Sequence, residues 1–161
     1  MLLLLIRHAD AGERDPHKWP DDTKRPLSKK GRRQQEKMNG RLRRRGYRPS
    51  RVLASPWTRA WQTAQLVARE FGTGSPEACE ALASIPKVEP ITSAIGAAGH
   101  GVTIALVGHE PWLGELASRL LTSSPSRLAI DFPKSGVLGI QLSEVKAGAG
   151  ELVFLWRPKA S

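Results

Sequence analysis

The chain begins with a short apolar run, Leu2 to Ile6, that leads directly into Arg7 and His8. A continuous apolar segment of this length is typical of a β-strand that is buried on both faces of a parallel sheet. It is too short to cross a membrane or to serve as a secretory signal, and charge follows it at once. Because ligands of open α/β sheets bind beyond the carboxyl ends of the strands, Arg7 and His8 are expected at a binding edge.

A second predicted strand, residues 51–55, is followed by Pro56 and by a helix predicted from Thr58 to Phe71. Small and apolar residues recur in this helix at three- and four-residue spacing, which indicates one buried face. Arg59 lies in its first turn, where free backbone N–H groups and the helix dipole favour a nearby anion. Arg59 is therefore a candidate anion ligand.

A third predicted strand, residues 103–107, is followed by Gly108 and His109. Pro111 suits the first position of a helix, and the spacing of the leucines predicts that this helix runs to Leu121. A second histidine thus follows a strand end. If the three strands are neighbours, two arginines and two histidines converge on one basin. These residues are Arg7, His8, Arg59 and His109.

The remaining segments alternate between helical and strand patterns, which is typical of an α/β domain. Further helices are predicted at residues 28–45 and 88–98, and further strands at residues 77–83, 136–142 and 151–156. Gly99 and Gly101 are expected to end the second of these helices. The last two strands flank a glycine-rich turn and should pair as a hairpin. We expect one three-layer α/β/α domain over residues 1–161, with a mainly parallel sheet and a late antiparallel hairpin.

Composition limits the classes of function. The chain has 161 residues, of which 40% are hydrophobic, and this suits one domain with its own core. A formal net charge of +10 favours anionic partners, although it does not choose among phosphorylated molecules, acidic proteins, nucleic acid and anionic membrane. The one cysteine, Cys79, excludes an internal disulfide. We expect no metal and no cofactor, and, without a targeting segment, a cytoplasmic location.

Much of the positive charge lies on the helix predicted at residues 28–45. Its apolar stripe is thin, with Met38 and Leu42 four residues apart, and nine of its positions are Lys or Arg. Such a run is commonly a solvated helix face. The other interpretation is a docking surface for an acidic partner. Nucleic-acid binding is not expected, because no nucleic-acid-binding motif accompanies the charge.

Four motifs lie at or beside the predicted strand ends. They are RHA at residues 7–9, RPLSKKG at 25–31, SPWTRAWQTA at 55–64 and GHEP at 108–111. Together, in this order, they resemble the histidine phosphatase superfamily, and in particular its small phosphohistidine phosphatase branch, the SixA type. The resemblance runs from Leu2 to about Leu142. The common family form of the first motif is RHG, and Ala9 is a variant that does not disturb the arginine–histidine pair.

The resemblance implies a role for each residue of the basin. His8 is the nucleophile that takes the phosphoryl group, and water then hydrolyses the phosphohistidine. Arg7 and Arg59 hold the phosphoryl oxygens, while His109 completes the pocket and stabilises the transferring group. These residue types suit the chemistry, because guanidinium groups bind phosphate oxygens bidentately and an imidazole can attack phosphorus. Lys134, in the FPKSG segment, is a further candidate phosphate ligand.

The lack of an identifiable general acid is a departure from the family pattern. Larger members of the superfamily supply an acidic residue that protonates an alkoxide-like leaving group, and the sequence does not identify one here. The candidates are Asp10, Glu13, Glu80 and Glu110. The imidazole that leaves from phosphohistidine can already carry a proton and depart neutral, so it needs less acid assistance. The missing acid therefore favours N–P substrates over P–O esters and argues against a sugar-phosphate mutase.

The sequence thus predicts a metal-independent phosphatase that acts through a covalent phosphohistidine at His8. Its expected substrate is a phosphohistidine on a signalling protein, such as a histidine phosphotransfer domain, and this expectation rests on the resemblance. Two alternatives stay open. One is a phosphatase for small phosphate esters or other phosphoproteins, and the other is a phosphate-binding module with little turnover. No membrane partner is expected.

Overall fold

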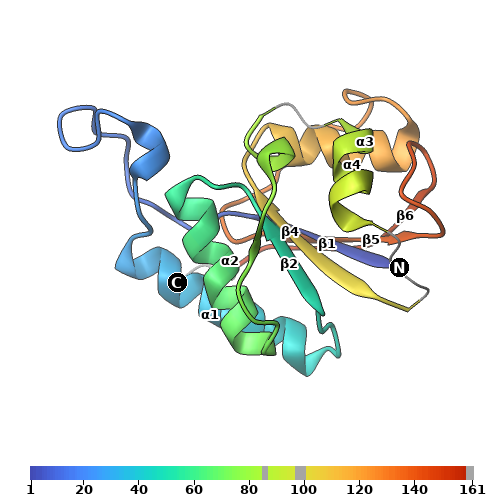
Figure 1. Cartoon of the computed structure of the whole chain (residues 1–161), viewed down its shortest axis with the longest axis horizontal. Helices are drawn as coiled ribbons and strands as arrows, with labels where there is room; N and C mark the ends of the chain where they lie inside the picture. Colours follow the sequence, from blue (N-terminus) through green and yellow to red (C-terminus); the bar gives the residue numbers. More distant parts are fainter. Residues whose placement is uncertain (85–86, 97–100, 159–161) are drawn as a thin grey trace.

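The computed structural model describes residues 1–84, 87–96 and 101–158 (Figure 1). The strands are β1 (Leu2–Arg7), β2 (Arg51–Ala54), β3 (Glu77–Ala78), β4 (Thr103–Gly108), β5 (Val137–Leu142) and β6 (Gly150–Trp156). The α-helices are α1 (Lys29–Arg44), α2 (Thr58–Phe71), α3 (Val88–Ile95) and α4 (Trp112–Thr122). Two short 3₁₀ helices, η1 (Asp22–Lys24) and η2 (Glu80–Leu82), lie in the connections.

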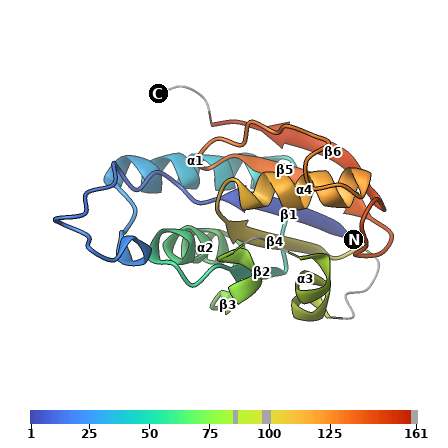
Figure 2. The same ribbon diagram turned by 90° about the horizontal axis from the view of Figure 1, so that it is seen from above.

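The six strands form one sheet in the order β3-β2-β4-β1-β5-β6. Strands β3, β2, β4 and β1 pair in parallel, whereas β5 is antiparallel to β1 and β6 is antiparallel to β5. Helices α1 and α2 cover one face, and α3 and α4 cover the other (Figures 1 and 2). The three-layer arrangement and the late hairpin are therefore confirmed.

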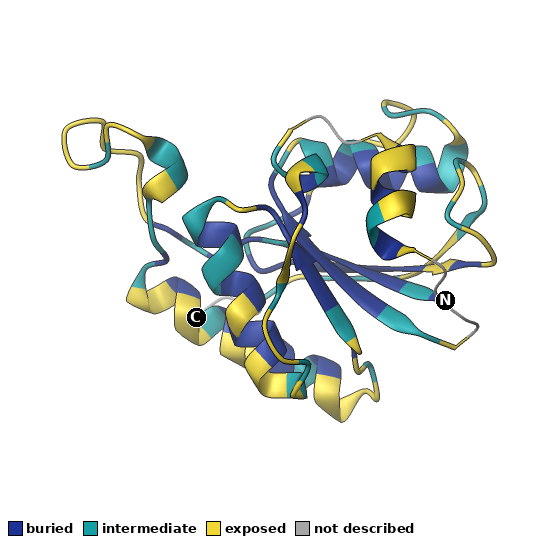
Figure 3. Cartoon of the chain, in the orientation of Figure 1, coloured by how far each residue is buried: buried dark blue, intermediate teal, exposed yellow. Residues whose placement is uncertain are grey.

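Strand β1 is the centre of this sheet and contributes to both layers of the core. Leu3 and Leu5 pack with α3 and α4, while Leu4 and Ile6 pack with α1 and α2, and all four side chains are fully buried (Figure 3). Each such side chain contributes about 1.5–3 kcal/mol through burial. The apolar run of the sequence thus has the predicted place, and it fixes the direction in which Arg7 and His8 leave the sheet.

Helix α2 has the predicted bounds, and α1 lies within the range predicted for it, with Ser28 and Arg45 as its caps. Ser28 caps α1, since its side-chain oxygen accepts the N–H of Gly31 at 2.9 Å. Gly31 lies so close to the backbone of Asp10 that a Cβ would overlap it, so the first turn of α1 is held against the segment that follows His8. Helix α2 ends at Gly72, which adopts the left-handed conformation with φ 67°.

The segment between β2 and β4 differs from the prediction. The edge strand expected within residues 77–83 has only two residues, because the chain turns into η2 after Cys79. The helix expected over residues 88–98 ends at Ile95, so the prediction that Gly99 and Gly101 end it was wrong. Gly96, at φ 67°, takes that place. Residues 97–99 lie outside the described part of the chain.

None of the helices in the described part of the chain is long and apolar enough to span a membrane.

Candidate active site

The three predicted strand ends are neighbours in the sheet. Strands β1 and β4 pair with Arg7 opposite Gly108, so His8 and His109 leave the sheet side by side. The backbone N–H of His8 donates to the carbonyl of Gly108 at 2.9 Å, and the centroids of the two imidazole rings are 5.1 Å apart. Strand β2 pairs with the other edge of β4, which brings Arg59 of α2 to the same place. The basin predicted from the sequence is thus formed.

The imidazole of His8 is buried and held in one tautomer. Its Nδ1 lies 2.7 Å from the carbonyl oxygen of Ala9, which can only accept a hydrogen bond, so Nδ1 carries the proton. Nε2 therefore carries the unprotonated lone pair, which accepts a hydrogen bond from Nε of Arg59 at 3.3 Å. Thr63 of α2 fixes the geometry, because its hydroxyl accepts the N–H of Ala9 at 3.0 Å and donates to the carbonyl of Arg59 at 2.7 Å.

Electrostatics keep both imidazoles neutral. Burial, followed by the charges of Arg59, Arg7 and Lys134, lowers the pKa of His8 from 6.5 to about 3, although the hydrogen bond to the Ala9 carbonyl acts in the opposite direction. Burial and the neighbouring His8, Arg59 and Arg7 lower the pKa of His109 to about 3 as well. At neutral pH, Nε2 of His8 is therefore an unprotonated nitrogen beside fixed positive charges.

Arg59 is positioned from three sides. Only 6% of the residue is exposed, and its guanidinium carbon lies 4.9 Å from the centroid of the Trp57 ring. Its Nη1 donates to the carbonyl of Asp22 at 2.8 Å and lies 3.3 Å from the Asp22 carboxylate. The same carboxylate accepts a hydrogen bond from Nε of Arg25 at 2.8 Å. Helix η1 of the 11–26 loop thereby holds the arginine in place.

Two buried nitrogens of the basin have no hydrogen-bond partner among the described residues. They are Nε of Arg7 and Nδ1 of His109. The other ends of both side chains are anchored, since Nη1 of Arg7 donates to the carbonyl of Phe132 at 2.8 Å and Nε2 of His109 lies 2.8 Å from the hydroxyl of Ser55. Buried polar atoms are nearly always paired, so these nitrogens fit the oxygens of a bound oxyanion.

Lys134 lies at the rim of the basin. Its ammonium group is 2.6 Å from the carboxylate of Asp10, which also accepts the hydroxyl of Ser28 at 2.7 Å. Burial favours the neutral form of Asp10, but the hydrogen bonds from Lys134, Ser28 and Gly12 outweigh it and lower its pKa to about 2. Lys134 thus contributes positive charge near His8, and its role as a phosphate ligand stays a prediction.

The four candidates for a general acid have different surroundings. Asp10 is ionised at neutral pH and so cannot donate a proton there. Glu110 is half-buried, accepts the N–H of Gly114 at 2.9 Å, and has a pKa that burial raises. Glu13 and Glu80 are exposed. Within the described part of the chain, none of these carboxylates is hydrogen-bonded to His8 or Arg59.

Sequence reasoning assigned no role to three residues that hold the basin together. These are Asp22, Ser55 and Thr63. Ser55 directly follows β2, and this position beside a strand end was a usable signal. Asp22 had none, because an aspartate in a polar loop is common. Trp57 and Trp112 lie against the ring of His109, with centroids 4.6 and 5.9 Å away, and close that side of the basin.

In residues 1–84, 87–96 and 101–158, no three or more His, Cys, Asp and Glu side chains are grouped in a way that could hold a metal ion.

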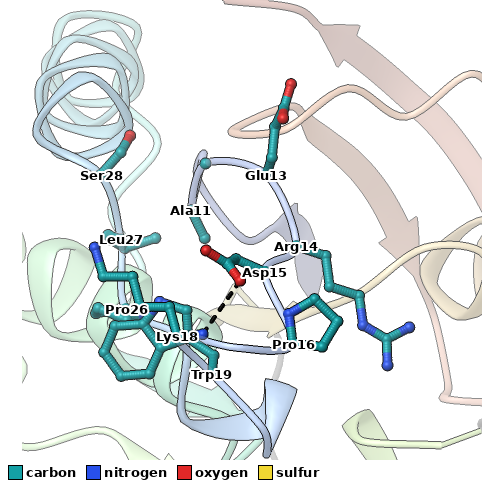
Figure 4. Close-up of a pocket in the computed structure, with 11 residues that line it drawn as sticks. Ala11, Glu13, Arg14, Asp15, Pro16, Lys18, Trp19, Pro26, Leu27 and Ser28 are labelled. Atoms are coloured by element: carbon teal, nitrogen blue, oxygen red, sulfur yellow. Dashed lines mark hydrogen bonds between the residues drawn. The ribbon is translucent and has the colours of Figure 1, made fainter.

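A hollow of about 570 Å³ lies within the loop that follows Asp10 (Figure 4). One wall is formed by residues 11–16, Lys18 and Trp19, and the other by Pro26, Leu27 and Ser28. The loop extends away from the sheet in Figure 1. Ser28, which lines this hollow, is hydrogen-bonded to Asp10, and Asp10 is paired with Lys134 at the rim of the basin.

Comparisons with known proteins agree with this geometry. The sequence model of the histidine phosphatase superfamily (branch 1) matches residues 3–86. The structure of the protein histidine phosphatase SixA complexed with tungstate is 26% identical, with a TM-score of 0.82, over 98% of this chain and 97% of that one. A protein assigned as phosphohistidine phosphatase SixA from Agrobacterium tumefaciens is 25% identical over the same shares, with a TM-score of 0.74.

A curated relative from Picosynechococcus sp., whose function is uncharacterised, is 28% identical over 99% of this chain and 98% of its own length. The family match covers more than half of the chain and includes RHA, RPLSKKG and SPWTRAWQTA. The structural likeness extends over nearly the whole chain, including the strand that leads to His109. The chain therefore belongs to the histidine phosphatase superfamily, as a phosphatase of the SixA type.

Proposed function

We propose that this phosphatase hydrolyses phosphohistidine on a signalling protein, without a metal, through a covalent phosphohistidine at His8. The state of His8 is the observation that carries the proposal. Its imidazole is neutral, its Nδ1 proton is bound to the carbonyl of Ala9, and its Nε2 lies 3.3 Å from the guanidinium of Arg59. A nucleophile for phosphorus needs such an unprotonated nitrogen beside groups that bind the phosphoryl oxygens.

The first chemical step transfers the phosphoryl group between two imidazoles. The Nε2 lone pair of His8 forms a bond to phosphorus while the N–P bond of the substrate breaks. The substrate imidazole, protonated on its other nitrogen, keeps that proton and departs as a neutral ring. His8 then carries the phosphoryl group on Nε2 and retains its Nδ1 proton.

The second step releases phosphate. The oxygen of a water molecule attacks phosphorus, the Nε2–P bond breaks, and its electron pair returns to the imidazole of His8. Both protons of the water leave with dihydrogen phosphate, and His8 is again neutral with its proton on Nδ1.

The charges around His8 account for stabilisation of both transition states. In addition to burial, the positive charges of Arg7, Arg59 and Lys134 lower the pKa of His8, and the same charges would attract the negative oxygens of the phosphoryl group. Nδ1 of His109 is a further donor if the hydroxyl of Ser55 donates to Nε2 of the same ring. These groups are held by carbonyls, carboxylates and aromatic rings before substrate arrives, so little reorganisation is required.

The leaving group supports an N–P substrate. Of the four acid candidates, Asp10 is ionised, and Glu13 and Glu80 are exposed and bonded to neither His8 nor Arg59. A substrate whose leaving group carries its own proton suits such a site. The similar SixA protein was solved in complex with tungstate, a tetrahedral oxyanion like phosphate, and this supports binding of a phosphoryl group by this chain.

One observation favours the alternative of a phosphate-ester substrate. Burial raises the pKa of Glu110, and a carboxyl that stays protonated at higher pH can donate a proton to an alkoxide. In the structure its carboxylate is instead bonded to the N–H of Gly114. The ester alternative therefore requires Glu110 to leave that contact.

A comparison of leaving groups tests the proposal. Hydrolysis of phosphoramidate and of p-nitrophenyl phosphate is measured in excess EDTA for wild type, His8→Ala and Glu110→Gln. We expect wild type and Glu110→Gln to hydrolyse phosphoramidate with a higher kcat/KM than the ester, and His8→Ala to hydrolyse neither.

Equal or faster ester hydrolysis that Glu110→Gln abolishes would replace the proposal with an ester phosphatase. Loss of activity in EDTA would contradict the metal-free mechanism. Phosphate binding without turnover of either substrate would leave a binding module.

A further inference from the structure

Helix α1 presents a line of positive charge that is not used inside the molecule. Five exposed Lys and Arg side chains share the side of α1 opposite the core, and they are called the basic stripe here. They are Lys29, Lys30, Arg33, Lys37 and Arg44. At 3.6 residues per turn they fall within about 100° of one another around the helix axis, and they extend for about 22 Å along it.

Of the other charged side chains of α1, three make contacts within the fold, whereas Arg32 is exposed and pairs with no described residue. Glu36 pairs with Arg69 at 2.9 Å and Arg43 pairs with Glu70 at 2.9 Å, both on the side that faces α2. Arg41 stacks on Trp156, 4.2 Å from the ring centroid. The basic stripe, by contrast, forms no ion pair with any described residue. Five uncompensated charges in a line attract an anionic surface of similar length.

The stripe begins at the rim of the active site. Ser28, which caps α1, donates its hydroxyl to Asp10, and Asp10 is paired with Lys134. Gly31 packs directly on the backbone of Asp10, two residues after His8. A partner that lies along the stripe would therefore have one end over the basin, next to the hollow lined by Leu27 and Ser28 (Figure 4).

The chemistry of the stripe favours a protein over the other anionic partners. Its five side chains are all Lys or Arg, so it offers no aromatic platform on which bases could stack. The nearby Trp156 is stacked on Phe154 and covered by Arg41. The exposed large hydrophobic residues of the described chain, Leu128, Leu152 and Val153, lie off α1, so α1 has no apolar wedge for a membrane.

We propose that the basic stripe of α1 docks an acidic helix face of the phosphoprotein substrate and delivers its phosphohistidine to the basin. This rests on the proposed function for the identity of the reacting group, but the docking itself does not require turnover. Carboxylates spaced three and four residues apart on the partner helix would face the stripe along its length. Such contacts act mainly on encounter and on KM, and they weaken with salt.

The test uses two synthetic phosphohistidine peptides. Each joins a phosphohistidine through a Gly-Ser spacer to a helical segment that is acidic in one peptide and has Gln for Glu in the other. The test variant is K30Q/R33Q/K37Q, and the matched control is R48Q/K87Q/R127Q. The control removes three exposed cations that lie off α1 and make no ion pair with a described residue. Gln has nearly the helix propensity of Lys and Arg, so α1 should persist.

We expect wild type to prefer the acidic peptide about tenfold in kcat/KM, as three to five surface charge pairs would give. K30Q/R33Q/K37Q should lose this preference and keep its activity on phosphoramidate, while R48Q/K87Q/R127Q should keep both. An equal loss in the control would show general charge steering and overturn the proposal. Absence of any preference in wild type would overturn it too, as would a duplex oligonucleotide that binds the stripe and displaces the peptide.

Binding of the unphosphorylated acidic peptide, followed by fluorescence anisotropy, separates docking from catalysis. If the peptide binds through the basic stripe but the protein does not hydrolyse phosphoramidate, docking is supported and the proposed function is refuted. Phosphoramidate hydrolysis with no stripe-dependent binding would do the reverse.

Discussion

Acidification from pH 7 to pH 5 is expected to destabilise the fold through the two histidines of the basin. Burial and the neighbouring positive charges lower the pKa of His8 and of His109 from the ordinary histidine value of 6.5 to about 3 in the folded protein. The folded state therefore binds fewer protons than the unfolded state at pH values between these two. The stability that the two neutral histidines contribute is fully present above pH 6.5 and is lost as the pH falls toward 3.

The size of the effect follows from the same values. Between pH 7 and pH 5 the unfolded histidine becomes almost fully protonated and the folded one does not, which removes about 2 kcal/mol for each histidine and about 4 kcal/mol for the pair. This is a large share of the 5–15 kcal/mol that is typical of the free energy of unfolding of a domain. Urea unfolding followed by tryptophan fluorescence at the two pH values measures it.

Single variants divide the effect. His8→Asn and His109→Asn should each lose about half as much stability between pH 7 and pH 5 as wild type, and the double variant should lose little. His17→Asn, at an exposed loop position, is the matched control and should behave as wild type. Wild type with the same free energy of unfolding at both pH values would refute the reasoning, as would a double variant that loses as much as wild type.

Three further predictions concern the groups that hold the basin. Asp22→Asn removes the carboxylate 3.3 Å from Arg59, and kcat/KM for phosphoramidate should fall about tenfold while the fold stays intact by circular dichroism. Ser55→Ala removes the partner of Nε2 of His109, and steady-state kinetics should show a lower kcat with a smaller change in KM. Lys134→Gln removes one charge that lowers the pKa of His8, so the acid limb of the kcat/KM profile should move to higher pH and KM should rise. These roles would be contradicted by an unchanged kcat/KM in Asp22→Asn, an unchanged kcat in Ser55→Ala, or an acid limb that does not move in Lys134→Gln.

The elements that carry the basin were predictable because their signals are local. The apolar run before Arg7, the amphipathic repeat from Thr58 and the Gly72 stop are each read from neighbouring residues, and all three agree with the structure. The segment between β2 and β4 was harder to predict. Gly96 ends α3 before the glycines that the sequence suggested, because several glycines lie close together there and only backbone conformation distinguishes them.

The supporting contacts were not predictable because they join distant segments. Asp22 reaches Arg59 across 37 positions, and Ser55 reaches His109 across 54. Neither pair has a sequence spacing that would identify it as a contact. The strand-end positions already grouped the two histidines and two arginines, and the resemblance to known motifs assigned a role to each. The adjacency of β1 and β4, which makes the basin, is a property of the sheet order alone.

The most direct test of the account is to trap and locate the phosphoryl group on the enzyme. Wild type and His8→Asn are mixed with phosphoramidate, quenched with alkali within milliseconds to seconds, and digested for mass spectrometry. The proposed mechanism predicts a phosphoryl group on His8 that survives alkali, is lost in acid and is absent from His8→Asn. A phosphoryl group on another residue, or turnover by His8→Asn at the wild-type rate, would contradict it.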